Sequence, residues 1–116
     1  MKKILLSLLV AASAISNAQV YKIGDNNGKT LNVCKGQFAS SMFTTTQNGI
    51  DGVAGYGNNE NYTVTFCSGD PTRRIRANFY YLNIETAYDF LYIYDGPTTA
   101  SPLLAQLTGD GNGTVV

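Results

Sequence analysis

The stretch Tyr88–Gly96, which reads YDFLYIYDG, carries apolar side chains on both faces of an extended chain. Aromatic residues occupy every second position, and Leu91 and Ile93 lie between them, so one face of a strand is aromatic and the other aliphatic. This pattern predicts a strand that is packed on two sides. Asp95-Gly96-Pro97 then ends the strand, because glycine permits a positive φ and proline lacks the N–H that a continuing ladder needs.

Several other segments have the short alternating pattern of strands. Residues 61–66 and residues 75–79 alternate between apolar and polar side chains, and residues 20–33 leave room for two short strands around a Gly/Asn turn. Residues 34–59 are rich in Gly, Ser, Thr and Asn, which predicts loops and weak strand. Outside the first 18 residues no segment keeps the apolar period of a helix, so the fold class is predicted to be all-β, an antiparallel β-sandwich.

The first 18 residues have the features of a secretory signal peptide. Lys2 and Lys3 precede an apolar run over residues 4–15, and Ser16 and Ala18 occupy the −3 and −1 positions of a cleavage site before Gln19. The run is shorter than the ~20 residues of a membrane-spanning helix. We therefore expect a secreted, extracellular or cell-surface protein with no membrane span after cleavage.

Charge and composition exclude several classes of function. After cleavage, residues 19–116 contain six basic and eight acidic residues, a net charge of −2, which does not favour nucleic acid as a partner. The chain has no histidine, and this excludes Ser-His-Asp triads and His-ligated zinc.

Residues 82–96 (LNIETAYDFLYIYDG), followed by residues 101–104 (SPLL) and Thr108-Gly109, resemble the middle of a CUB domain. Residues 55–67 (GYGNNENYTVTFC) resemble the version found in secreted proteins of some Gram-negative bacteria. The resemblance implies a jelly-roll β-sandwich, with a flanking segment at 19–33 and a CUB-like domain at 34–116. A CUB domain would continue through further strands, so we expect this one to be missing its last strands. The alternative is a minimal domain that closes differently.

Cys34 and Cys67 are the only cysteines of the chain. An even number of cysteines in an exported protein predicts a disulfide, and a free buried thiol is the alternative. The resemblance supports the disulfide, because the first two cysteines of the family pair at the same relative positions.

Two carboxylates are the candidate ligands of a metal ion. If residues 78–84 and 89–94 form a hairpin, Glu85 and Asp89 lie at the two ends of the connecting turn and converge. Convergent carboxylates suit Ca²⁺, which takes 6–8 oxygen ligands, whereas spacing alone favours an Asp89 that caps the turn and an exposed Glu85. The resemblance implies calcium at Glu85 and Asp89 with Tyr88 nearby, and a third acidic ligand from a later loop that the chain as given does not reach.

These observations predict a non-catalytic recognition or accessory module of a secreted protein, calcium-stabilised, that binds an extracellular protein or a glycan. Catalysis by Glu85 and Asp89 is not expected, because paired carboxylates that hydrolyse glycosides flank a cleft and one short turn has no opposite wall. The alternative is the N-terminal module of a larger secreted hydrolase or adhesin.

Overall fold

The computed structural model of the protein describes residues 19–43 and 55–116. The predicted signal peptide, residues 1–18, lies outside the described residues, and so does the central part of the predicted loop segment, residues 44–54. Within the described residues the regular structure consists of strands and one 3₁₀ turn. The prediction of an all-β fold is confirmed.

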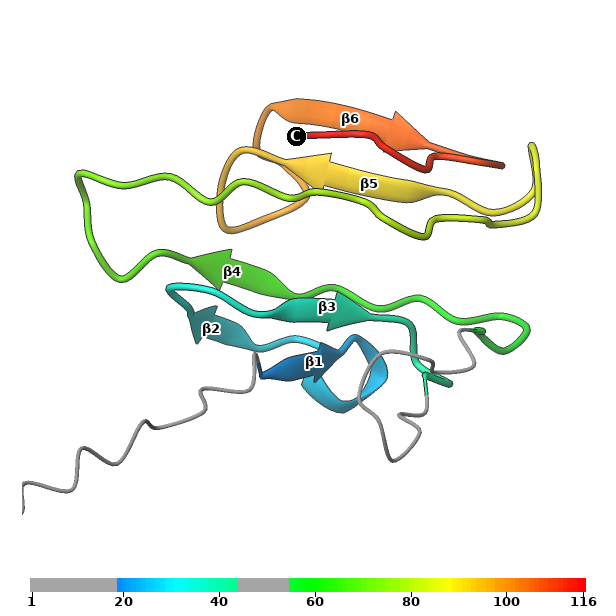
Figure 1. The fold of residues 1–116 in the computed structure, drawn as a ribbon, viewed down its shortest axis with the longest axis horizontal. Helices are drawn as coiled ribbons and strands as arrows, with labels where there is room; N and C mark the ends of the chain where they lie inside the picture. Colours follow the sequence, from blue (N-terminus) through cyan, green and yellow to red (C-terminus); the bar gives the residue numbers. More distant parts are fainter. Residues whose placement is uncertain (1–18, 44–54) are drawn as a thin grey trace, which may run out of the picture.

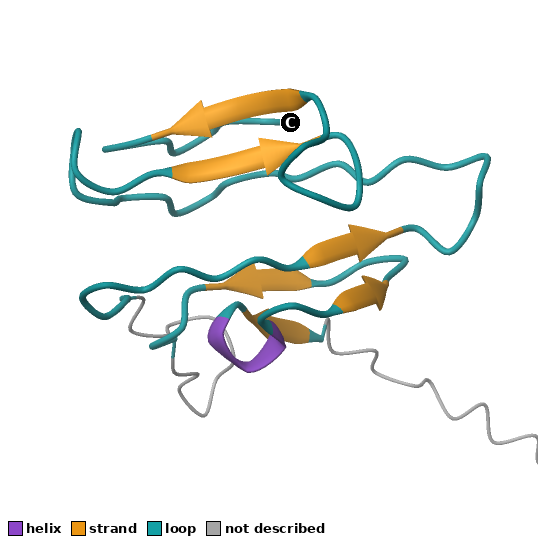
Figure 2. Cartoon of the chain, turned by 180° about the vertical axis from the view of Figure 1, so that it is seen from behind, coloured by secondary structure: helices purple, strands orange, loops and turns teal. Residues whose placement is uncertain are grey.

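The elements are short, and Figure 1 labels the strands in chain order. They are β1 (Val20–Lys22), η1 (Gly24–Asn26), β2 (Thr30–Asn32), β3 (Gln37–Ala39), β4 (Thr65–Cys67), β5 (Leu91–Tyr94) and β6 (Leu103–Leu107). The two strands expected in residues 20–33 are therefore present, with η1 between them. Figure 2 shows that loops account for much of the remaining chain.

The N-terminal strands form two parallel pairs, where the sequence predicted antiparallel pairing. β1 pairs with β3, and β2 pairs with β4. The reason lies in the chain reversals: β2 runs opposite to β1, and β3 runs opposite to β2, so each pair joins strands separated by two reversals (Figure 1). The antiparallel prediction is wrong for these two pairs.

β5 and β6 form an antiparallel pair. Leu91 pairs with Leu107 and Ile93 with Ala105, and the register shifts between Ile93 and Tyr94. The rings of Phe90, Tyr92 and Tyr94 follow one another along one face, with centroids 5.9 and 6.4 Å apart. The aromatic face predicted from the alternation is confirmed for these three rings. The predicted packing on both sides is wrong, because Phe90 and Tyr92 are 39% and 45% exposed.

Residues 77–84 pair antiparallel with residues 109–116 rather than with β5. The backbone N–H groups of Ala77 and Val116 each donate to the carbonyl of the other, at 2.8 and 3.0 Å. At the opposite end the Ile84 N–H donates to the Gly109 carbonyl at 3.1 Å. This ladder replaces the hairpin expected between residues 78–84 and 89–94, and we call it the C-terminal ladder below.

The two groups of strands form two layers in Figure 1, with β1–β4 in one and the C-terminal ladder, β5 and β6 in the other. No hydrophobic side chain of the described residues is fully buried. Leu103 and Leu104 of β6 are each more than half exposed, so the apolar faces are only partly covered. A two-layered arrangement is visible, but its layers do not enclose a continuous core.

The N-terminal layer contains an aromatic cluster around Phe66 of β4. The Phe66 ring contacts the edges of Tyr21 from β1 and Phe38 from β3, with centroids 5.9 and 5.6 Å apart. Edge-to-face aromatic contacts stabilise beyond the area that they bury.

We predict that Phe66→Ala lowers the free energy of unfolding by about 2–3 kcal/mol, less than the loss of about 3–5 kcal/mol for a fully buried phenylalanine, because Phe66 is only partly buried. Urea unfolding of the full chain measures the change. Tyr81→Ala is the control, because Tyr81 is 89% exposed and its loss should change stability by less than about 0.5 kcal/mol. Equal losses in the two variants would show that the cluster does not stabilise the fold.

Candidate functional site

The segment from Glu85 to Asp89 forms a single tight turn between the C-terminal ladder and β5. The Glu85 carbonyl accepts hydrogen bonds from the N–H groups of Tyr88 and Asp89, at 3.3 and 3.0 Å. Ala87 has φ of 65°, a left-handed conformation that costs a non-glycine residue about 1 kcal/mol or more. The Ala87 N–H donates to the Thr108 hydroxyl at 2.9 Å, and this bond holds the strained residue in place.

Thr108 and Gly109 close the ladder side of this turn. The Thr108 hydroxyl donates to the Glu85 carbonyl at 3.3 Å. Gly109 is buried, with φ of 69°, and a Cβ there would lie 2.9 Å from the Thr86 hydroxyl oxygen. A glycine is therefore required at the point where the two segments meet.

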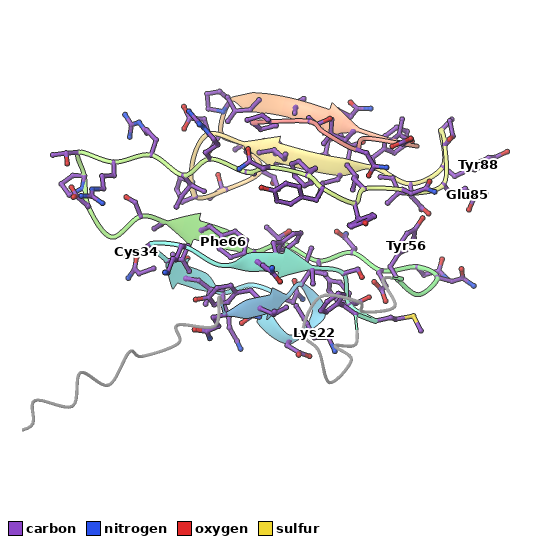
Figure 3. All side chains as sticks on the ribbon, in the orientation of Figure 1. Lys22, Cys34, Tyr56, Phe66, Glu85 and Tyr88 are labelled. Atoms are coloured by element: carbon purple, nitrogen blue, oxygen red, sulfur yellow. The ribbon has the colours of Figure 1, made fainter. Side chains whose placement is uncertain are left out.

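The Tyr56 hydroxyl joins a distant loop to the turn. It donates to Asp89 Oδ2 at 2.7 Å and accepts a hydrogen bond from the Glu85 N–H at 2.9 Å. Figure 3 shows Tyr56 directed toward the end of the molecule that carries Glu85 and Tyr88. Asp89 therefore does more than close the turn, because its carboxylate also accepts a hydrogen bond from a residue in another part of the chain.

Glu60 holds the loop that carries Tyr56. Its carboxylate accepts a hydrogen bond from the Gly57 N–H at 2.7 Å and from the Ser41 hydroxyl at 2.6 and 2.8 Å. These bonds fix the backbone next to Tyr56 and connect it to the N-terminal layer. Glu60 therefore positions Tyr56.

Sequence reasoning named Tyr88 as the tyrosine that supports the site, whereas the structure brings Tyr56 to it. The Tyr88 side chain is 79% exposed and makes no hydrogen bond with the described residues. The contacts of Tyr56 span 29 and 33 residues of sequence, so no local pattern reveals them. The only signal available was a tyrosine between two glycines, Gly55 and Gly57.

Both carboxylates of the turn act on the Tyr56 phenol. The hydrogen bond from the Glu85 N–H lowers the pKa of Tyr56, but the hydrogen bond to Asp89 and the negative charges of Asp89 and Glu85 raise it by more. The net result is a pKa above the usual value of 10.0. The phenol stays neutral and donates its proton to Asp89 across the physiological range.

The oxygen atoms at the turn are of the kind that binds a hard cation, but they are too few to fill its coordination shell. Glu85 is exposed and its carboxylate makes no hydrogen bond with the described residues, while Asp89 has one carboxylate oxygen that Tyr56 does not engage. Among the described residues no group of three or more acidic, histidine or cysteine side chains is placed to hold a metal. Since Ca²⁺ takes 6–8 oxygens, water or further ligands would have to complete its shell.

The two cysteines are free thiols in the structure. Cys34 follows β2 and is exposed, and Cys67 ends β4 and is half-buried. Their segments are neighbours, because Asn32 pairs with Cys67 and the Val33 N–H donates to the Cys67 carbonyl at 2.7 Å. The predicted disulfide is not formed in the structure and stays a prediction.

Comparison with known proteins gives a limited match. No family model and no solved structure matches the chain. It is similar to multiple epidermal growth factor-like domains protein 8 of Rattus norvegicus, Mus musculus and Homo sapiens, with 39% identity over 59 residues in each case. The match covers 51% of this chain and 2% of each relative's length. Within the described residues, no helix is long and apolar enough to cross a bilayer.

We predict that Tyr56→Phe lowers the free energy of unfolding by about 0.5–1.5 kcal/mol, because the Glu85 N–H and Asp89 lose a partner at an exposed site. The effect depends on pH. A raised pKa in the folded chain means that the stabilisation is present below about pH 10 and is lost as the pH rises beyond it. Chemical unfolding of both proteins at neutral and high pH measures this.

Ultraviolet titration of tyrosinate provides the control. The chain has eight tyrosines, and subtracting the Tyr56→Phe curve from the wild-type curve isolates one of them. We expect the isolated transition above pH 10. A transition at or below pH 10, or two proteins of equal stability, would contradict the hydrogen-bonded arrangement.

For the cysteines we predict that the intact mass of the secreted protein is lower by two hydrogens before reduction than after it. Cys34→Ser should then lower the free energy of unfolding by about 3–4 kcal/mol on the chain-entropy model. Identical masses under both conditions would leave the two thiols of the structure as the native state.

Proposed function

We propose that this chain is a non-catalytic, extracellular recognition module of CUB-like type whose binding surface is the turn between Glu85 and Asp89. One observation supports this most directly. The Tyr56 hydroxyl forms hydrogen bonds at both ends of the turn, so the backbone of the turn is held in one conformation before a partner binds. A preorganised surface binds with a smaller loss of conformational freedom than a mobile loop.

Support for an extracellular module comes from two sides. The similar proteins are named for epidermal growth factor-like domains, which are modules of extracellular proteins, and the identity of 39% extends over half of this chain. The sequence adds the signal peptide and the CUB-like blocks at residues 82–96 and 101–104. We also propose that the protein is exported and that Cys34 and Cys67 form a disulfide.

Recognition fits the geometry better than catalysis. The side chains that meet at the turn are two carboxylates and a neutral phenol, and the raised pKa of the Tyr56 phenol does not activate it as a nucleophile. Glu85 and Asp89 belong to one exposed turn, which leaves no opposite wall against which a substrate could be held. The charge of the turn instead suits a cation or a basic group of a protein partner.

Calcium would serve this surface as a structural ion. Glu85 and Asp89 would supply carboxylate oxygens, and a bound Ca²⁺ would neutralise their charge and rigidify the turn. A basic side chain of the partner could then approach the coordinated carboxylates. A second candidate function, favoured by the 2% coverage of much longer relatives, is the same module at the front of a larger secreted hydrolase or adhesin.

We expect Ca²⁺ to raise the stability of the full chain by about 1.4 kcal/mol when its concentration is tenfold above the dissociation constant. Thermal unfolding in a Ca²⁺ titration, with Mg²⁺ as a second ion, measures this effect. Glu85→Gln and Asp89→Asn remove the charge of each ligand with little change of shape and should abolish the stabilisation.

Asp25→Asn is the matched control, because Asp25 is an exposed aspartate of η1 in the other layer. It should retain the full response to Ca²⁺. No stabilisation of the wild type, or equal stabilisation of all four proteins, would disprove calcium binding at the turn.

A further inference from the structure

We propose that the connection between β4 and the C-terminal ladder, residues 68–76, binds an acidic polysaccharide through Arg74 and Arg76. Arg73, Arg74 and Arg76 are three of the six basic residues in residues 19–116, and all three are exposed. This inference goes beyond the proposed function, because it concerns a separate surface of opposite charge. The choice of a polysaccharide as the ligand rests on the proposed export of the protein.

Hydrogen bonds close the first part of this connection into a turn. The Ser68 hydroxyl donates to the Asp70 carbonyl at 2.7 Å, and the Arg73 N–H donates to the same carbonyl at 3.1 Å. The Asp70 carboxylate accepts hydrogen bonds from the N–H and the hydroxyl of Thr72, at 2.8 and 2.7 Å. The backbone of residues 68–73 is therefore fixed, and so is the point from which the following arginines extend.

The positive charge of this part of the chain is only partly balanced. Residues 61–84 contain one acidic residue, Asp70, and its Oδ2 atom forms a salt bridge with Arg73 Nε at 3.3 Å. Arg74 and Arg76 form no salt bridge with the described residues. Two positive charges are therefore left for a ligand.

The segment that carries Arg74 and Arg76 is extended. Residues 73–77 contain no turn or bend, and the chain enters the C-terminal ladder at Ala77, whose N–H donates to the Val116 carbonyl at 2.8 Å. In an extended chain every second side chain points to the same side, at a spacing of about 6–7 Å along the chain. The two guanidinium groups can therefore contact neighbouring acidic groups of one ligand.

The basic connection and the acidic turn lie at opposite ends of the molecule. Figure 1 shows the connection projecting beyond the strands between β4 and the C-terminal ladder, and Figure 3 shows Glu85 and Tyr88 at the other end. Interactions between exposed charges are largely screened beyond about 8 Å at physiological salt. The carboxylates of the turn therefore do not repel an acidic ligand at the arginines.

The arginine pair suits a ligand with repeated acidic groups. A guanidinium group offers five N–H donors in a planar fork and binds a sulfate or carboxylate group through two parallel hydrogen bonds. Short clusters of basic residues are typical of surfaces that bind heparin or nucleic acid. The net charge of −2 for residues 19–116 disfavours nucleic acid, and acidic polysaccharides are ligands that an exported protein meets.

The test uses the full chain and three oligosaccharides of equal length: a heparin fragment, an oligogalacturonate and a neutral dextran fragment. Amide spectra are recorded during each titration in the presence of EDTA, so that calcium binding at the turn cannot contribute. We expect at least one acidic oligosaccharide to bind with a dissociation constant of about 0.01–1 mM at low salt and to shift the amide signals of residues 73–76 most. Binding should weaken severalfold at about 0.3 M salt, because the charges are screened, and the dextran should not bind.

Variants then assign the binding to the two arginines. Arg74→Gln and Arg76→Gln should each weaken it about threefold to fivefold, the effect of losing one exposed ion pair, and the double variant should weaken it about tenfold or more. Lys29→Gln is the matched control, because it removes the same charge from an exposed residue of the N-terminal layer. It should retain the affinity of the wild type.

The proposal is overturned if neither acidic oligosaccharide shifts an amide signal, if the dextran binds equally well, or if Lys29→Gln weakens binding as much as the double variant. Tighter binding to vesicles of phosphatidylglycerol through the same arginines would also overturn it, since the surface would then belong to a membrane. Glu85→Gln should bind the acidic oligosaccharide as the wild type does, so a failure at the turn and a failure at the arginines are separate results. Export is tested independently by the intact mass of the secreted protein.

Discussion

The C-terminal ladder is the constraint on which the candidate turn depends. Its reciprocal bonds between Ala77 and Val116 fix one end, and the bond from Ile84 to Gly109 fixes the other, where the Glu85 turn begins. Figure 1 shows the two segments running alongside β5 and β6. Residues far apart in sequence are thereby brought together at each end.

Backbone hydrogen bonds between strands matter more than usual for the stability of this structure, because side-chain burial is limited. The described residues include no fully buried hydrophobic side chain, so the transfer of apolar surface from water is incomplete. Aromatic contacts compensate in part: the Phe66 cluster connects β1, β3 and β4, and the row from Phe90 to Tyr94 follows β5. Tyr56 adds a polar connection from the residue 55–60 loop to the turn.

The sequence predicted what depends on local periodicity. The alternation in residues 88–96 identified β5 and its aromatic face, and the alternation in residues 61–66 identified β4. Strand partners were predicted less well, because pairing is decided by contacts across the whole chain. Residues 75–79 alternate as expected for a strand, but nothing in residues 77–84 distinguishes pairing with residues 89–94 from pairing with residues 109–116. β3 lies within residues 34–59, where the sequence predicted only loops and weak strand, because its three residues are too few to show a period.

The candidate turn was likewise predicted only in part. Glu85 and Asp89 lie four residues apart, so their proximity followed from the sequence, whereas Tyr56 reaches them from outside any local window. The position of Tyr56 changes the surroundings of the two carboxylates. The neutral phenol satisfies one oxygen of Asp89 and leaves the Glu85 carboxylate without a hydrogen-bond partner among the described residues. A ligand at the turn would therefore meet both negative charges, through the Glu85 carboxylate and through the second oxygen of Asp89.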